Sequence, residues 1–285
     1  MTTPDHWLSL EGYAYRYRWH PPATGSERRP PVVFLSGAFQ SMESWGRFVD
    51  VFQEEHGVLL VDLPGSGDAD ALPPEFGLDF LADALQRLFA ELDLPPAYVV
   101  CASYGSPIGY RFAQRYPTRV WQLVLAGVMH ALDSDLRTMM EEGVVLAAAR
   151  KRDAFADFTV ERLLCSDPDR TIARRRPVVR ALHRSLLRMS DEELDRFVWN
   201  TRRILVSPPL DLTRPPRCPT LIFTGEHDCF TPPEICRYIA SCLPDAHFTT
   251  IAEADHVFHL QRFDATVALL LDFAEGRLTL RTEAA

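Results

Sequence analysis

Short apolar runs recur along this 285-residue chain and predict buried strands. Five of them stand out, at residues 32–35, 58–61, 98–102, 123–126 and 221–223. Runs that are this short and this apolar are typical of parallel strands covered on both faces. A further strand is expected over 248–251. The opening stretch, 7–19, alternates in part between apolar and polar residues and predicts an antiparallel hairpin at the edge of the sheet.

Segments with helical periodicity lie between these strands. In the clearest one, apolar residues return every three or four positions: Leu78, Leu81, Leu85, Leu88, Phe89 and Leu92. Strands that alternate with helices imply right-handed βαβ units. The pattern therefore predicts an α/β protein with a mostly parallel central sheet and helices on both faces.

The alternation stops after Val128. Helical patterns fill the next stretch, and the first strand-like run in it is I-L-V at 204–206. The strand pattern resumes at P-T-L-I-F-T-G, which begins at Pro219. We therefore expect a helical cap over residues 130–212, inserted into a core made of residues 1–129 and 213–285.

Composition excludes several classes of function. Hydrophobic residues make up 47% of the chain and charged residues 24%, which is typical of globular proteins. The net charge of −9 argues against nucleic-acid binding. No apolar run approaches the ~20 residues of a membrane span, and the first residues lack the pattern of a signal peptide. The six cysteines are scattered without C-x-x-C pairs, so we expect reduced thiols, no metal, no cofactor and a cytoplasmic location.

A C-x-S-x-G motif at residues 101–105 places Ser103 where the strand at 98–102 gives way to a helix that runs to about Tyr116. Such a sharp turn exposes one side chain and requires small neighbours, usually as G-x-S-x-G. Here Cys101, Gly105 and Ser106 take the crowded positions. The N-terminus of the helix would favour negative charge near Ser103, so Ser103 is the candidate nucleophile.

A serine hydroxyl needs a base to take its proton. His256 follows the strand expected at 248–251, and Asp228 follows the one at 221–223, which gives the order Ser, Asp, His. We predict that His256 is the base and that Asp228 orients it. Glu226 and Asp133 are alternative acids, and His259 is an alternative base whose expected role is packing or lining a pocket.

Acyl transfer also needs N–H donors for an oxyanion. The backbone N–H of Tyr104 directly follows the candidate nucleophile. A second donor is expected in the loop S-G-A-F-Q-S after the strand at 32–35, where Gly37 permits a tight turn. We predict that this donor is the N–H of Ala38, with that of Phe39 as the alternative.

These motifs together resemble the α/β-hydrolase family. L-S-G-A-F-Q-S is similar to the family's H-G-x turn, with Ser36 in place of the common histidine. V-D-L-P-G-S-G at 61–67 is similar to its D-x-x-G-x-G turn, and G-E-H-D and A-D-H fit its acid and base positions. A-S-Y-G-S, the helical insertion and the closing G-E-H-D…A-D-H pattern also resemble the hydroxyacyl-transferring synthase of rhamnolipid biosynthesis. That resemblance implies 3-hydroxyacyl units taken from carrier-protein thioesters and joined by an ester bond.

The insertion and the loops near the candidate triad supply the expected pocket. We predict substrate contacts from Phe39, Met129, Met139, Phe230 and Val257. Flexible methionines suit variable acyl chains, although core filling is their more frequent use. Four arginines of the insertion recur every four residues and share one helical face: Arg176, Arg180, Arg184 and Arg188. This stripe is either a solvated outer face or a docking face for an acidic acyl carrier protein or a phosphopantetheine arm.

Three functional hypotheses follow from the sequence. The first is a serine hydrolase that forms an acyl-Ser103 intermediate from an ester or thioester and releases it to water. The second, which the resemblance to the rhamnolipid synthase implies, is an acyltransferase that joins 3-hydroxyacyl units from carrier-protein or CoA thioesters. The third is a non-catalytic ligand-binding protein on the same fold.

Overall fold

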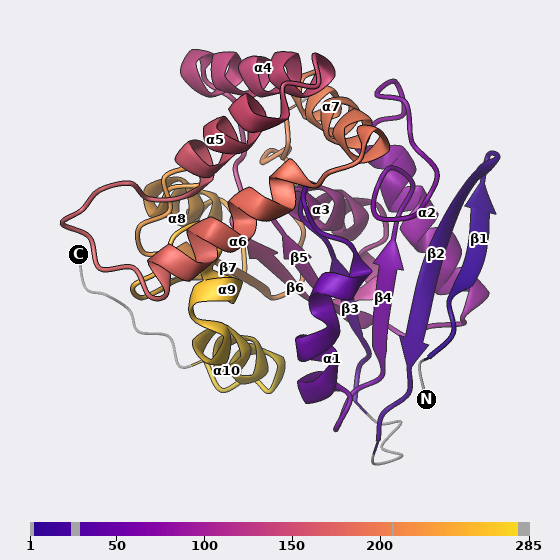
Figure 1. Ribbon diagram of the computed structural model, residues 1–285. Helices are drawn as coiled ribbons and strands as arrows, with labels where there is room; N and C mark the ends of the chain where they lie inside the picture. Colours follow the sequence, from indigo (N-terminus) through magenta and orange to yellow (C-terminus); the bar gives the residue numbers. More distant parts are fainter. Residues whose placement is uncertain (1–2, 24–28, 207, 279–285) are drawn as a thin grey trace.

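The computed structural model describes residues 3–23, 29–206 and 208–278. Its centre is an eight-stranded sheet with the order β1-β2-β4-β3-β5-β6-β7-β8 (Figure 1). The strands are β1 (His6–Leu10), β2 (Tyr13–His20), β3 (Val32–Leu35), β4 (Val58–Asp62), β5 (Ala97–Ala102), β6 (Val120–Ala126), β7 (Thr220–Gly225) and β8 (Ala246–Ile251). The predicted strands and the predicted edge hairpin are all present.

The sheet brings several loops to one edge. β1 pairs antiparallel with β2, and β2 pairs antiparallel with β4. From β4 to β8 every neighbouring pair is parallel. The loops that follow β3, β5, β7 and β8 therefore open at the same edge of the sheet, where ligands of open α/β sheets bind.

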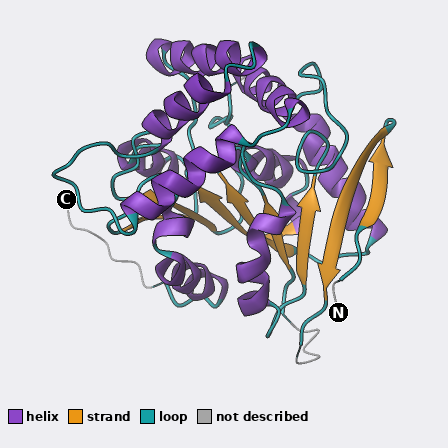
Figure 2. Ribbon diagram, in the orientation of Figure 1, coloured by secondary structure: helices purple, strands orange, loops and turns teal. Residues whose placement is uncertain are grey.

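Helices cover both faces of the sheet, as predicted (Figure 2). The alternation of side chains along β3 shows the two layers, because Val33 and Leu35 enter one core cluster and Val32 and Phe34 enter the other. The first cluster includes α2 (Leu78–Glu91), α3 (Gly105–Arg115) and α8 (Pro233–Ser241). The second includes α1 (Gly46–Phe52) and α10 (Phe263–Ala274).

Four further helices lie together above the carboxyl edge of the sheet (Figure 1). They are α4 (Ser134–Ala148), α5 (Arg152–Leu163), α6 (Arg175–Leu187) and α7 (Asp191–Val206). They pack around a core cluster of their own, which includes Phe155, Leu186 and Leu194. The run at 204–206 is not a strand, because it forms the last turn of α7 and Ile204 faces the core. The division into a core and a cap stays a prediction.

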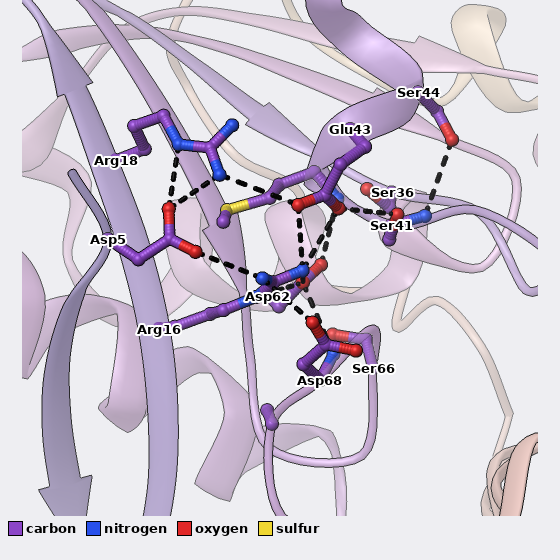
Figure 3. Close-up of polar contacts among 12 residues, drawn as sticks. Asp5, Arg16, Arg18, Ser36, Ser41, Glu43, Ser44, Asp62, Ser66 and Asp68 are labelled. Carbon is purple, nitrogen blue, oxygen red and sulfur yellow. Dashed lines mark hydrogen bonds and ion pairs between the residues drawn. The ribbon is translucent and has the colours of Figure 1, made fainter. Parts of the chain in front are cut away.

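An ion-pair cluster around the buried side chains of Arg16 and Asp62 fixes the loops on the β3–β4 side of this edge (Figure 3). Asp62, at the end of β4, accepts hydrogen bonds from Arg16 Nε at 2.9 Å and from the Met42 N–H at 2.8 Å. Arg16 also pairs with Glu43 at 2.9 Å. Burial raises the pKa of the Asp62 carboxyl even though Arg16 opposes this. Arg16 pairs with Asp68 as well, at 2.8 Å, so the cluster joins β2, the turn after β4 and the 3₁₀ helix η1 (Met42–Trp45).

No helix within the described residues is both long enough and apolar enough to span a bilayer.

Candidate active site

Ser103 occupies a strained turn between β5 and α3. Its φ of 46° lies in the left-handed region, which a non-glycine residue adopts only when its surroundings hold it there. The Ser103 N–H donates to the Ala126 carbonyl at 2.7 Å, and the Ser103 carbonyl accepts from the Ser106 N–H at 2.8 Å. These bonds hold the hydroxyl at the tip of the turn, where α3 begins.

Two glycines permit the close packing of this turn. A Cβ on Gly105 would lie 2.6 Å from the Leu35 carbonyl oxygen, which belongs to the neighbouring strand β3. A Cβ on Gly109 would lie 2.1 Å from the Cys101 sulfur. Cys101, which departs from the usual glycine, is accommodated because Gly109 leaves room for its side chain on the first turns of α3.

Ser103, His256 and Asp228 form a continuous hydrogen-bonded chain. The Ser103 Oγ lies 3.1 Å from His256 Nε2, and His256 Nδ1 lies 2.8 Å from Asp228 Oδ2. A carboxylate only accepts hydrogen bonds, so Nδ1 carries the proton and Nε2 faces the serine hydroxyl as an acceptor. The other Asp228 oxygen accepts the backbone N–H groups of Phe230 and Thr231, both at 2.8 Å.

Burial and mutual attraction determine the pKa values of Asp228 and His256. Burial alone would raise the pKa of Asp228, but His256 and the donors around the carboxylate outweigh it and hold that pKa below its ordinary value. Burial alone would lower the pKa of His256, yet the Asp228 carboxylate raises it above the ordinary value. Protonation of the imidazole is therefore favoured by its partner.

The alternative acids and the alternative base lie outside this chain of hydrogen bonds. Glu226 is half-exposed and accepts the Glu253 N–H at 3.0 Å. Asp133 is exposed and caps α4, where its carboxylate accepts the Leu136 N–H at 2.8 Å. His259 lies 3.2 Å from the Gln40 amide nitrogen.

Two backbone N–H groups beside Ser103 have no protein acceptor in the part of the chain that the structure describes. They are those of Ala38 and Tyr104, and both residues border the same cavity as Ser103. The N–H of Gly37 is already used, because it donates to Gln40 Oε1 at 2.8 Å. The structure thus leaves the two predicted oxyanion donors free.

Gln40 is a residue of the site that the sequence analysis missed. Its amide nitrogen donates to His259 Nε2, so it connects the loop after β3 to α9 (Phe258–Gln261). Burial lowers the pKa of His259 to about 4, which keeps its ring neutral and able to accept this bond. In the sequence, Gln40 was marked only by its position three residues after Gly37.

Ser36, which replaces the common histidine, accepts a hydrogen bond from Trp45 Nε1 at 3.0 Å.

Ser103 and His256 open into a cavity of about 480 Å³. Its wall is mostly apolar and is formed by the loops of the sheet edge and by helices α4 to α7. All five predicted substrate-contacting residues lie on this wall: Phe39, Met129, Met139, Phe230 and Val257. Asn200 and Thr201 of α7 also border it and were not predicted. The sequence could not identify Asn200 and Thr201 as cavity residues, because nothing in it showed which face of α7 turns toward Ser103.

The predicted arginine stripe runs along the outer surface of α6, with Arg188 directly after the helix ends. Arg176, Arg180, Arg184 and Arg188 are exposed, and none of the four side chains has an ion-pair or hydrogen-bond partner among the described residues. The same helix borders the cavity through Ala181, Leu182 and Ser185.

Within the described ranges, no three His, Cys, Asp or Glu side chains are grouped so that they could hold a metal ion.

Comparisons with known proteins identify hydrolases and esterases that resemble this chain. A pimeloyl-[acyl-carrier protein] methyl ester esterase of Chromobacterium violaceum is 28% identical, over 86% of this chain and 94% of that protein. A 2-hydroxy-6-oxononadienedioate/2-hydroxy-6-oxononatrienedioate hydrolase of Paraburkholderia phymatum is 26% identical, over 93% of each chain. The enol-lactonase of Burkholderia xenovorans has a similar structure, with a TM-score of 0.80 and 22% identity over 95% of this chain and 100% of that one.

These relatives are hydrolases and esterases, which supports an enzymatic role for this chain. Residues 30–263 match the profile of the alpha/beta hydrolase fold family over most of the sheet and all four helices above it. The chain therefore belongs to the alpha/beta hydrolase fold family.

Proposed function

We propose that this protein is a serine esterase or thioesterase that works through an acyl-Ser103 intermediate. The observation that carries the proposal is the hydrogen-bonded chain from Ser103 through His256 to Asp228 at the wall of an apolar cavity. A ligand-binding protein would need neither a strained serine nor a base within reach of it.

The chemistry follows from the positions of these groups. His256 Nε2 takes the proton of the Ser103 hydroxyl as its oxygen attacks the acyl carbon, and the charge of Asp228 stabilises the imidazolium that forms. The N–H groups of Ala38 and Tyr104 bind the oxyanion of the tetrahedral intermediate. Collapse of the intermediate expels the alcohol or thiol, which receives the proton from His256. Water then repeats the sequence and releases the acid.

The cavity and the relatives support an acyl substrate. The apolar wall suits a hydrocarbon chain, and Met139 and Met140 give it the flexibility to accept more than one chain length. The relative from Chromobacterium violaceum is named for an ester whose acyl group is held by a carrier protein. For this chain we propose an acyl ester or thioester as the bond that is cleaved.

Labelling and turnover test this proposal directly. A fluorophosphonate probe should modify Ser103 in the native enzyme, and p-nitrophenyl acyl esters should be hydrolysed. Ser103→Ala should abolish both, and Ser106→Ala, in the first turn of α3, is the matched control for labelling. An unlabelled Ser103 together with no turnover of any acyl ester or thioester would favour the ligand-binding alternative.

Transfer to an alcohol is the second candidate, and the apolar enclosure of the site favours it. Helices α4 to α7 cover Ser103 with mostly apolar side chains, which limits the access of water to an acyl-enzyme. Mass spectrometry of the products from 3-hydroxyacyl thioesters distinguishes the two reactions. Free 3-hydroxy acids mean hydrolysis, and a hydroxyacyl ester dimer means transfer.

The stripe of unpaired arginines on α6 supports an acidic acyl carrier protein as the partner that delivers the substrate. Opposite charge steers such a partner to the surface, and this helix also borders the cavity. Arg180→Glu with Arg184→Glu should raise KM for a carrier-bound acyl group and leave KM for the same acyl group on a small thiol unchanged. Equal KM values for the carrier-bound substrate in native and variant enzyme would remove the carrier protein from the proposal.

A further inference from the structure

One face of α7 contacts both segments that bear the free N–H groups beside Ser103. The contacts come from Phe197, Asn200 and Arg203, which recur every three residues and so lie near one another on the helix surface. Phe197 contacts the loop after β3, and Asn200 and Arg203 contact the residue that follows the nucleophile. No other helix of the described segment at 134–206 has hydrogen bonds to Tyr104.

The contact with Tyr104 is a closed hydrogen-bond network. The Tyr104 hydroxyl donates to Asn200 Oδ1 at 3.1 Å and accepts from Arg203 Nη1 at 2.8 Å. Arg203 Nη1 also donates to Asn200 Oδ1 at 2.5 Å, and Asn200 Nδ2 donates to the Gly65 carbonyl at 2.9 Å. Each polar atom of this network therefore has a partner, so the Tyr104 ring is held in one orientation.

Arg203 anchors this network with all of its donors. Besides the two bonds described above, its Nε donates to the Phe76 carbonyl at 2.5 Å, and its Nη2 donates to the carbonyls of Leu72 at 2.8 Å and Pro73 at 3.0 Å. The side chain is fully buried, and no carboxylate in the described ranges pairs with it. A buried cation held only by neutral acceptors is costly, although the carbonyl end of α7 offsets part of its charge.

The contact with the other segment is aromatic. The Phe39 ring stacks on Phe197 of α7, with centroids 5.3 Å apart and an angle of 15° between the planes. Phe155 of α5 packs edge-on against both rings. Phe39 directly follows Ala38, whose N–H is the second free donor, so α7 constrains the loop at the point where it faces Ser103.

We infer that α7 is the element that positions both oxyanion donors, with Asn200 and Arg203 acting through the Tyr104 side chain and Phe197 acting through Phe39. The inference rests on the proposed function, because the donors matter only if an oxyanion forms at Ser103. None of these three α7 side chains touches the reacting atoms, so they are positioning residues. Their effect should appear in the transition state rather than in binding of the acyl chain.

Tyr104→Phe is the sharpest test, because it removes one hydroxyl and leaves the ring and the backbone in place. We expect kcat to fall roughly tenfold, a fraction of what the loss of a whole oxyanion donor costs, with KM within twofold of the native value. The affinity for a trifluoromethyl ketone inhibitor, which forms an oxyanion, should fall in parallel with kcat/KM. Phe197→Leu should also lower kcat and inhibitor affinity through the other segment, but its KM is not part of the test because Phe197 borders the cavity.

Arg202→Met is the matched control, because Arg202 lies on the same helix, is exposed and has no partner among the described residues. It should leave kcat, KM and inhibitor affinity at native values. If Tyr104→Phe lowers the melting temperature but keeps native kcat and inhibitor affinity, the network is structural and the inference is wrong. If the native enzyme itself turns over no acyl ester and Ser103 stays unlabelled, the proposed function fails instead.

Discussion

Replacement of Asp228 by asparagine should disable the enzyme by changing which nitrogen of His256 carries the proton. Asp228 Oδ1 accepts two backbone N–H groups, from Phe230 and Thr231. In Asp228→Asn the amide oxygen must keep that position, because an NH₂ group there would face two donors. The new NH₂ group then faces His256 Nδ1, which has to become an acceptor. The proton moves to Nε2, and the imidazole can no longer accept the proton of Ser103.

The size of this effect follows from the role of the tautomer. In Ser-His-Asp enzymes of other folds the same change lowers kcat by about 10⁴-fold, which corresponds to about 5.4 kcal/mol of transition-state stabilisation. We expect a loss of that order here, because Asp228 is fully buried and water cannot replace it beside His256. The fold should survive, since the side chains are nearly equal in shape.

The pH profile gives a second readout of the same variant. Only unprotonated His256 can act as a base, and the Asp228 carboxylate raises the pKa of that ring. In the native enzyme kcat/KM should therefore rise with pH through a midpoint above about 6.5, the ordinary value for histidine. In Asp228→Asn neither protonation state of His256 can take the Ser103 proton, so the residual kcat/KM of the variant should lose this rise with pH.

The assay is hydrolysis of a p-nitrophenyl acyl ester between pH 5 and 9, followed at 405 nm or, in acid, by quenching. Glu226→Gln and Asp133→Asn are the matched controls, because they neutralise the two alternative acids. Both should keep kcat within a few-fold of the native value. The reasoning would be refuted if Asp228→Asn kept kcat within tenfold of native while either control lost it.

Three further predictions concern the packing around the site. Gly109→Ala should destabilise the fold by about 1–3 kcal/mol in urea unfolding, because its Cβ overlaps the Cys101 sulfur. Adding Cys101→Ala should recover most of that loss, and purely additive free energies would show that the overlap is not the cause. Arg16→Met should cost about 3–5 kcal/mol in the same assay, because it leaves the buried Asp62 without its cation, and a loss below 1 kcal/mol would contradict this. Gln40→Leu frees the Gly37 N–H and should lower kcat roughly tenfold, whereas native kcat would show that the loop needs no such support.

The sequence was sufficient to predict the sheet, because each buried strand can be recognised from its own few residues. Strands buried on both faces must be apolar along their whole length, so runs such as 58–61 and 221–223 stand out against polar loops. The run at 204–206 is as apolar as these strands, but it is not a strand. It is the end of a helix whose Ile204 faces the core, and three residues are too few to show a helical period.

The candidate site was partly predictable, because turns and strand ends restrict which residues can occupy them. Ser103, Asp228 and His256 each follow a strand, and parallel strands end at one edge. The roles of Gln40 and Arg203 could not be predicted, because they depend on partners that are far away in the chain. Gln40 meets His259 across 219 residues, and Arg203 meets Tyr104 across 99.

Intact-protein mass spectrometry during turnover of an acyl thioester tests the central claim most directly. Rapid acid quenching should reveal one acyl group per chain, and peptide mapping should place it on Ser103. The adduct should be absent in Ser103→Ala and should form much more slowly in His256→Ala. Native turnover by Ser103→Ala, or an acyl group attached to any other residue, would contradict the account.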